Sequence, residues 1–343
     1  MKYKKILILC SVYILMFICS PTIFAASDEK IISNQTVTHE YETLDLTSIK
    51  KVNLNKDSKV TDFISHEDWE NLLQKKYKEK YPDYNGEITI NDVTMEQYLK
   101  TNISVGSSKD IDNKGNHSII PYSLYSAPST GFPNGSVGKT IFVYYHSDGT
   151  IDQLSASAFK VNGTTVGTAG HAVYSHDLNG WADTASIFFG LKDTPVGWEF
   201  NAAYTATGVR TNNDWVNTGN FRSDFGALDI RLDVGTAPSN LSLYKNPPST
   251  ANNVKNFGYP GWVDQKAFNT SSGNVVTGPL AYLHQTYEAH NNSVVSAFGM
   301  SGGPLLNANN QVIGINSYRS DSGYGPTSGF MKMTTEAYNL IMQ

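Results

Sequence analysis

Cysteine is almost missing from this chain. Its 343 residues include two cysteines, Cys10 and Cys19, and both lie within the first 26 positions. There a basic start precedes an apolar run from Ile6 to Ile18, and small residues follow up to Ala26. We interpret residues 1–26 as a secretory signal peptide of the Gram-positive type, because a membrane span needs about 20 apolar residues. An uncleaved anchor is the alternative. The exported chain would then contain no cysteine, which excludes disulfides and a thiol nucleophile.

Basic tracts and metal-binding clusters are also missing. The net charge is −5 and no run of Lys and Arg stands out, so nucleic acid is not an expected partner. No Cys/His cluster has the spacing of a zinc site, and we expect neither a metal nor a cofactor. Once the signal peptide is removed, we expect no stable membrane association.

Charged residues are scarce in one part of the chain and dense in another. Residues 27–117 hold 29 Asp, Glu, Lys and Arg in 91 positions, whereas residues 118–343 hold 25 in 226. This change marks a boundary between an N-terminal block (27–117) and a C-terminal block (118–343). The N-terminal block has too few apolar residues for a large core of its own. We predict a partly helical pro-segment that docks on the rest; an independent accessory domain is the alternative.

One helix of the N-terminal block can be predicted in detail. Ser65 can cap it, with Asp68 three residues later, and Pro82 would end it. Four apolar residues then recur on one helical face: Trp69, Leu72, Leu73 and Tyr77. A second short helix is predicted at 94–100, and the polar stretch 107–116 is typical of a linker.

The C-terminal block has the pattern of an all-β fold. Short β-prone runs are separated by Gly, Asn, Asp and Pro, which favours a barrel or sandwich over βαβ units. The predicted strands are 139–145, 155–161, 227–232, 253–257 and 311–315, and one helix is predicted at 334–342.

A serine among glycines is the first candidate for chemistry. Ser301 lies in Phe298-Gly299-Met300-Ser301-Gly302-Gly303-Pro304. Glycines permit the tight turn that presents a nucleophile, and the amides of Gly299 and Ser301 could bind an oxyanion. The stretch also fits the nucleophile elbow of α/β-hydrolases, in which the histidine follows the serine. All eight histidines precede Ser301, which excludes the α/β-hydrolase interpretation.

Two chain orders remain for a serine triad. The order acid–histidine–serine would need Asp148 or Asp152, and neither lies in a recognisable motif. The order histidine–acid–serine is that of the chymotrypsin-like barrels.

The best histidine is His171, because the small residues of Gly167-Thr168-Ala169-Gly170 would pack tightly and fix its ring. We assign no catalytic role to His146, His176, His284 or His290. The acid candidate is Asp224, which leads directly into an apolar strand and could be shielded there. Asp229 is the rival, but it alternates with Leu228 and Ile230 and is expected to face solvent beside Arg231.

Three segments together resemble the trypsin-like serine proteases. They are Thr168-Ala169-Gly170-His171, Asp224-Phe225-Gly226-Ala227-Leu228 and Gly299-Met300-Ser301-Gly302-Gly303-Pro304. The secreted glutamyl endopeptidases (V8 protease-like) are the most similar branch, and Gly258-Tyr259-Pro260-Gly261 also matches it.

This resemblance implies two antiparallel six-stranded β-barrels, at about 118–235 and 236–343, preceded by a signal peptide and a pro-segment. It implies Ser301 as nucleophile, His171 as general base and acid, Asp224 as its orienting partner, and the Gly299 and Ser301 amides as oxyanion hole. The expected activity is that of a secreted, monomeric endopeptidase that acts on protein or peptide substrates and is made as a zymogen.

Three departures from the family bear on specificity and processing. Ala172 follows the histidine where many relatives have cysteine. Asn316, fifteen residues after Ser301, replaces the histidine that contacts a substrate glutamate, although Ser296 can still donate a hydroxyl. Val295 offers no carboxylate for Lys or Arg. We therefore expect a weakened glutamate preference and acceptance of other polar or small side chains.

The nearest match to the family's mature N-terminus is Ser118-Ile119-Ile120-Pro121, which predicts removal of the pro-segment close to Ser118.

Two other functions fit the candidate triad residues. One is an inactive protease-fold protein that binds peptide or protein, and the other is an esterase or acyl hydrolase with the same triad.

Overall fold

The computed structural model describes residues 35–46, 49–52, 61–93, 124–178, 180–261, 269–277, 285–290, 294–322 and 325–343. The predicted signal peptide, the helix at 94–100, the linker at 107–116 and the processing region near Ser118 lie outside these residues. Within the described ranges, no helix is both long and apolar enough to span a membrane.

The first barrel closes through six antiparallel strands in the order β14-β11-β6-β7-β8-β15, and β15 pairs back to β14. Every residue of β6 is buried, because one of its faces lines the barrel and the other is covered. β-Branched and aromatic residues suit such a strand. The strands are β6 (Val137–Tyr145), β7 (Thr150–Lys160), β8 (Thr165–Thr168), β11 (Thr184–Phe189), β14 (Ala202–Asn212) and β15 (Gly226–Gly235).

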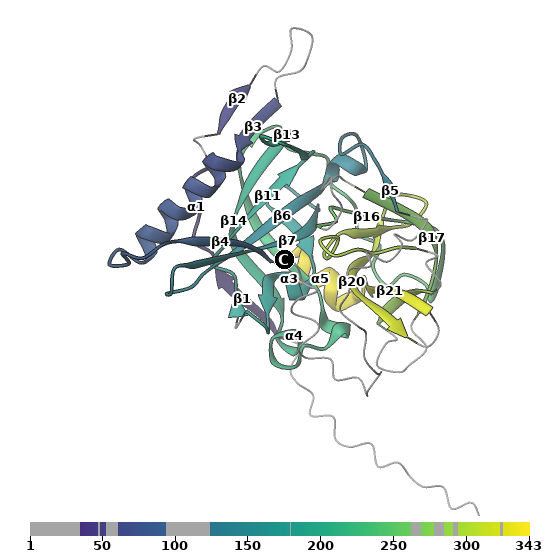
Figure 1. Ribbon diagram of the computed structural model, residues 1–343. Helices are drawn as coiled ribbons and strands as arrows, with labels where there is room; N and C mark the ends of the chain where they lie inside the picture. The colour runs from purple at the N-terminus through teal and green to yellow at the C-terminus, as the bar shows by residue number, and fades with distance from the viewer. Residues whose placement is uncertain are drawn as a thin grey trace, which may run out of the picture. The chain divides into compact units, whose positions relative to one another are not determined.

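The second barrel has the same closed form, in the order β16-β19-β20-β21-β18-β17 with β16 paired to β17. Four of its strands, β16, β17, β20 and β21, are labelled in Figure 1. Its interior is a separate apolar cluster that includes Val254, Tyr287 and Phe330. The strands are β16 (Thr250–Gly258), β17 (Asn269–Thr277), β18 (Thr286–His290), β19 (Pro304–Leu306), β20 (Val312–Ser322) and β21 (Gly325–Lys332). The prediction of two six-stranded antiparallel barrels is confirmed, and the five predicted runs fall on β6, β7, β15, β16 and β20.

The chain returns from the second barrel to the first through its last helix, α5 (Thr335–Met342). Thr334 caps this helix by accepting from the Ala337 amide at 3.2 Å. Arg210 of β14 donates through Nε to the Leu340 carbonyl at 2.9 Å, and Ile341 is fully buried. The predicted C-terminal helix is therefore present and belongs to the core of the first barrel.

Short elements connect the barrels and flank the strands. They are β5 (Tyr125–Ser126), η2 (Asn134–Ser136), α3 (Gly170–Val173), β9 (Tyr174–Ser175), β10 (Gly180–Trp181), β12 (Lys192–Thr194), β13 (Gly197–Phe200), α4 (Asn213–Thr218) and η3 (Phe221–Ser223).

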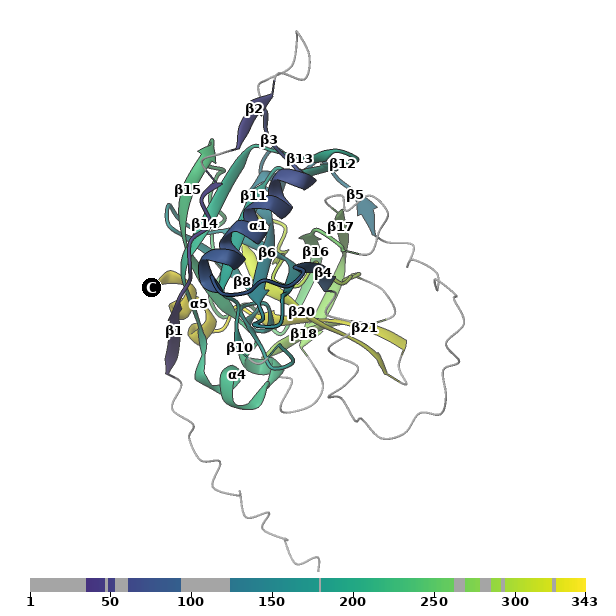
Figure 2. The same cartoon turned by 60° about the vertical axis from the view of Figure 1, so that its left-hand side comes forward.

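Helix α1 (His66–Lys80) of the N-terminal block lies on the outside of the first barrel (Figures 1 and 2). Its predicted cap is present, since Ser65 Oγ accepts from the Asp68 amide at 2.9 Å. Trp69, Leu73 and Tyr77 are buried, as their spacing predicts. The helix ends before Pro82, as expected.

The N-terminal block also contains four strands that the sequence analysis missed. β1 (Thr36–Glu40) pairs with β14, and β4 (Thr89–Val93) runs parallel to β7. β2 (Lys50–Val52) and β3 (Thr61–Ser65) form a four-stranded sheet with β12 and β13. The sequence analysis predicted a helix of this block but none of its strands. The reason is that strand formation depends on partners, and three of these four strands pair with residues of the C-terminal block.

A buried lysine lies at the end of β7. Lys160 is 1% exposed, and its Nζ donates to the Gly163 carbonyl at 3.0 Å and also to that of Asn162. The ammonium also lies 5.2 Å from the centroid of the Tyr204 ring. No carboxylate pairs with it among the described residues. Burial lowers the pKa of Lys160 to about 8.

This pKa predicts how stability depends on pH. An unfolded lysine has a pKa of about 10.4. Between the pKa of folded Lys160 and this value, the unfolded chain therefore holds more protons than the folded one. Lys160 should therefore make the protein more stable as pH rises through that window. In urea unfolding, the stability difference between wild type and Lys160→Met should shift in favour of wild type from pH 7 to pH 9.5. A difference that does not change with pH would contradict this.

Candidate active site

His171 and Asp224 form a buried pair in the first barrel. β8 leads through Ala169 into α3, which carries His171, and Asp224 lies between η3 and β15. His171 Nδ1 lies 2.7 Å from Asp224 Oδ2, and the His171 amide donates to Asp224 Oδ1 at 2.7 Å. Asp224 is fully buried and His171 is 5% exposed. The carboxylate favours the proton on Nδ1, which leaves Nε2 with its lone pair; Nε2 is buried and has no partner among the described residues.

The small residues before His171 have a steric reason. A Cβ on Gly170 would lie 3.1 Å from Asp224 Oδ1 and from Thr211 Oγ1. A larger residue would therefore push the histidine and the acid apart. This supports the argument that tight packing fixes the ring.

Ser317 is a third member of this cluster, and sequence reasoning missed it. It lies on β20 of the second barrel, is 5% exposed, and donates through Oγ to Asp224 Oδ2. The carboxylate thus accepts from two groups of the first barrel and one of the second. No local motif marks Ser317, and only the docking of the barrels brings it to Asp224.

Asp229 occupies a different environment. It is half-exposed and pairs with Arg210, whereas Arg231 donates to Asp233 at 3.1 Å. The Asp229 side chain thus lies at the surface, and the cation that it pairs with is Arg210 of β14. The cause is the pairing of β14 with β15, which places Arg210 close to Asp229.

The remaining histidines lie elsewhere. His146 bonds to Asp152 at 3.0 Å, and His176 lies 2.9 Å from the Trp215 carbonyl. His284 lies outside the described residues, as does the side chain of His290.

The Ser301 loop is fixed against the first barrel by Ser157 of β7. The Ser157 amide donates to the Ser301 carbonyl at 2.7 Å, and its Oγ donates to the Gly299 carbonyl at 2.8 Å. Thr168 Oγ1 in turn donates to the Ser157 carbonyl at 2.9 Å. Ser301 is therefore held close to the segment that ends in His171, although no hydrogen bond joins the two side chains.

Two glycines allow this close approach. Gly302 has φ +81°, and a Cβ there would collide with Thr168 Oγ1 and the Ser157 carbonyl. Gly299 has φ +86°, and a Cβ there would lie 2.6 Å from the Gly261 amide. The Gly258-Tyr259-Pro260-Gly261 motif thus packs directly against the Ser301 loop.

The amides of Gly299 and Ser301 have no hydrogen-bond acceptor among the described residues, and the same is true of the Phe298 amide. The Met300 amide donates to the Ala297 carbonyl at 2.9 Å, and the Gly302 amide donates to the Asn316 carbonyl at 2.8 Å. Free donors on either side of a bonded residue can bind a negative oxygen.

The predicted specificity residues lie together in a buried polar cluster. Ser296 Oγ donates to Asn316 Oδ1 at 2.6 Å, and Asn316 Nδ2 donates to Asn256 Oδ1 at 3.4 Å. Asn256 Nδ2 donates to the Val295 carbonyl at 2.8 Å. Ser328, a further residue that sequence reasoning missed, accepts from the Ser296 amide at 2.9 Å. Every member of the cluster is uncharged.

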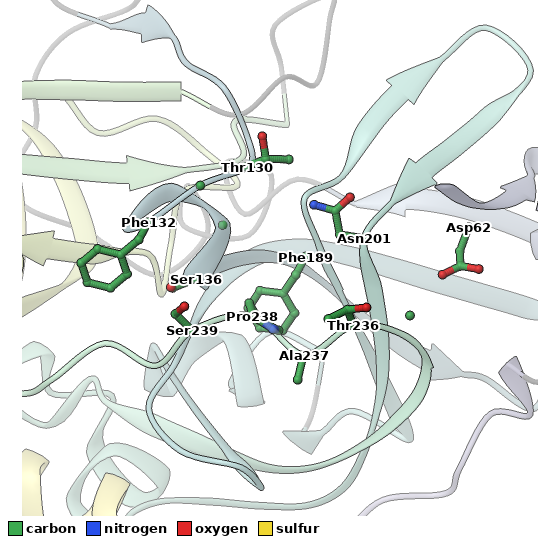
Figure 3. Close-up of a pocket in the computed structure, with 13 residues that line it drawn as sticks. Asp62, Thr130, Phe132, Ser136, Phe189, Asn201, Thr236, Ala237, Pro238 and Ser239 are labelled. Carbon is green, nitrogen blue, oxygen red and sulfur yellow. The ribbon is translucent and has the colours of Figure 1, made fainter. Parts of the chain in front are cut away.

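A separate hollow of about 700 Å³ is lined mainly by residues of the segments 130–136 and 235–239 (Figure 3). Its walls include Asp62, Phe189, Asn201 and Pro238, and none of His171, Asp224 or Ser301 is among them. We therefore place the candidate active site at the His171–Asp224 pair and not here. Among the described residues, no group of three or more His, Cys, Asp or Glu is arranged to hold a metal.

Comparison with known proteins agrees with the resemblance. The chain is 24% identical over 206 residues to the glutamyl endopeptidase of Bacillus licheniformis, a match that covers 59% of this chain and 61% of that protein. It also matches the solved structure of a Glu endopeptidase in complex with MPD, with a TM-score of 0.52 and 19% identity over 64% of this chain and 95% of the other. No protein-family profile matches the chain.

The predicted resemblance to glutamyl endopeptidases and to the chymotrypsin-type fold is thereby confirmed. The match spans less than two thirds of the curated relative, and the structural likeness concerns the fold.

The contact between the barrels predicts the effect of adding one methyl group. Gly302→Ala should destabilise the protein by more than about 2 kcal/mol, because the new Cβ meets backbone and takes an unfavourable φ. Gly163→Ala is the matched control, since a Cβ there meets nothing within 4 Å and should change stability by less than about 0.5 kcal/mol. Urea unfolding measures both. Equal effects would show that the loop is not closely packed against β7 and β8.

Proposed function

We propose that this protein is a secreted serine endopeptidase that uses Ser301, His171 and Asp224. The observation that carries the proposal is the buried Asp224 carboxylate, which bonds the ring and amide of His171 and the Ser317 hydroxyl. The likeness to a glutamyl endopeptidase supports peptide bonds as the substrate.

The proposed reaction follows from these positions. His171 Nε2 accepts the proton of Ser301 while Oγ bonds to the scissile carbonyl carbon. Asp224 stabilises the imidazolium that forms, and the free Gly299 and Ser301 amides bind the oxyanion. The imidazolium then protonates the departing amine, and a water molecule hydrolyses the acyl-enzyme by the same steps. The Ser301–His171 bond would form when substrate binds, because catalytic hydrogen bonds are often long without it.

We further propose that residues 1–26 direct secretion and that residues 27–117 are a pro-segment, cut close to Ser118. The protease part would contain one copy of residues 118–343 and no cofactor. Its two barrels would divide near residue 235, where β15 ends.

Substitution of the triad tests the proposal. Ser301→Ala, His171→Ala and Asp224→Ala should each lower peptide turnover by about 10⁴-fold or more, because the three residues act as a unit. Asp229→Ala is the matched control, since it removes the rival acid and should keep activity close to wild type. The readout is hydrolysis of a mixed peptide library by fully processed protein. Normal activity of Asp224→Ala would remove that residue from the mechanism. A wild type without turnover would favour a binding protein, and turnover of esters alone would favour an acyl hydrolase.

The uncharged polar cluster predicts the preferred side chain before the cut. Ser296 already donates to Asn316, so a substrate carboxylate would meet neutral donors only, and charge-assisted bonds are about twice as strong as neutral ones. We expect cleavage after glutamine or another neutral polar residue to be at least about tenfold faster than after glutamate, because an unmatched charge is costly to bury.

The same library measures this preference. Asn316→His should restore cleavage after glutamate. Faster cleavage by wild type after glutamate than after glutamine would contradict the expectation.

A further inference from the structure

The N-terminal block is built into the first barrel through backbone pairing. β1 adds a strand to β14, β3 pairs with β13, and β4 pairs with β7. These strands reach three different strands of the C-terminal block, so the barrel provides hydrogen-bonding edges on several sides.

Helix α1 adds an apolar contact. The Trp69 ring lies 5.8 Å from that of Phe188 and 5.3 Å from that of Trp198, and Trp69 Nε1 donates to Gln153 Oε1 at 2.6 Å. Leu73 belongs to the same buried cluster as the barrel interior. Without the helix, Phe188 and Trp198 would face water as a patch that promotes association.

Three tyrosine hydroxyls of the block bond to carbonyl groups in or beside the turn that joins β6 and β7. Tyr77 donates to His146 at 2.9 Å, Tyr81 to Tyr145 at 3.1 Å, and Tyr84 to Asp148 at 2.8 Å. The block therefore satisfies polar groups of the barrel as well as covering its apolar surface.

An ion pair completes the interface. Lys80 Nζ lies 2.5 Å from Asp183 Oδ1, and the other oxygen of Asp183 accepts from the Tyr145 amide at 2.7 Å. Lys80 also bonds to Glu42 of its own block at 2.9 Å. Loss of the block would leave the partly buried Asp183 without this cation.

None of these contacts involves the candidate active site. His171, Asp224 and Ser301 make no hydrogen bond, ion pair or ring contact with the described residues of the block, 35–46, 49–52 and 61–93. The described part of the block thus stabilises the barrel without contacting the triad.

We propose that the N-terminal block stays bound after the chain is cut near Ser118, as a non-covalent subunit of the active enzyme. This inference rests on the proposed function for the cut itself. The partner of the outer face of the first barrel is then the chain's own segment of residues 35–93, held by its strands, α1 and Lys80.

The test uses the full chain with the recognition site of a sequence-specific protease placed at residues 109–114. After cutting, size-exclusion chromatography and intact mass should show both fragments in one peak at equal amounts. A fluorophosphonate probe should label Ser301 in that peak. Separation of the block from a fragment that stays folded and is still labelled would overturn the inference. Fragments that elute together without labelling would overturn the proposed function, while the binding of the block to the barrel after the cut would still hold.

Single substitutions locate the interface. In the cut protein, Trp69→Ala should raise the dissociation constant of the two fragments by about a hundredfold or more, the size expected for loss of a buried aromatic ring. Glu70→Ala, next to it on the exposed face of α1, should change it less than about threefold. Where Trp69→Ala does not fold, Tyr81→Phe serves instead, since it removes one hydroxyl and keeps the ring. Equal dissociation constants for Tyr81→Phe and wild type, together with equal values for Trp69→Ala and Glu70→Ala, would contradict the inference.

Discussion

The structure around the candidate site depends on one buried charge. The Asp224 carboxylate has no exposed surface, and a buried carboxylate is tolerated only where donors replace its lost hydration. His171 supplies two of these donors and Ser317 supplies the third. Because Ser317 belongs to the second barrel, docking of the barrels completes the set of donors to the charge. The histidine ring is oriented within the first barrel by its bond to Asp224.

Ser157 performs the corresponding task for the Ser301 loop. Its amide and hydroxyl bond to the carbonyls on either side of Met300, and the Tyr259 amide donates to the same hydroxyl at 3.0 Å. A strand of the first barrel therefore fixes the backbone of a loop in the second. The positive φ angles of Gly299 and Gly302 make that approach possible, and they leave two amides free to bind an oxyanion. Catalysis at Ser301 would depend on these contacts between the two barrels as much as on the proposed triad.

The sequence was sufficient for those features whose causes are local. The cap at Ser65, the apolar face of α1 and the small residues before His171 each follow from neighbours in the chain. Chain order alone excluded the α/β-hydrolase fold. The contacts of Ser157, Ser317 and Ser328 could not be predicted. Each serine lies in an ordinary strand sequence, and its contact depends on residues that are distant in the chain. The strands of the N-terminal block were missed for the same reason, since their partners lie in distant parts of the chain. Asp229 shows the limit of strand alternation: it indicates the exposed face, but not the pairing with Arg210, which comes from the neighbouring strand β14.

We expect one reactive atom in this protein, the Ser301 hydroxyl oxygen. The most direct measurement is to treat the processed protein with a fluorophosphonate and to locate the adduct by peptide mass spectrometry. We expect a single adduct on the peptide that contains Ser301, and its loss in His171→Ala while Asp229→Ala is labelled normally. An adduct on another serine, or an unmodified Ser301 in correctly folded and processed protein, would contradict it.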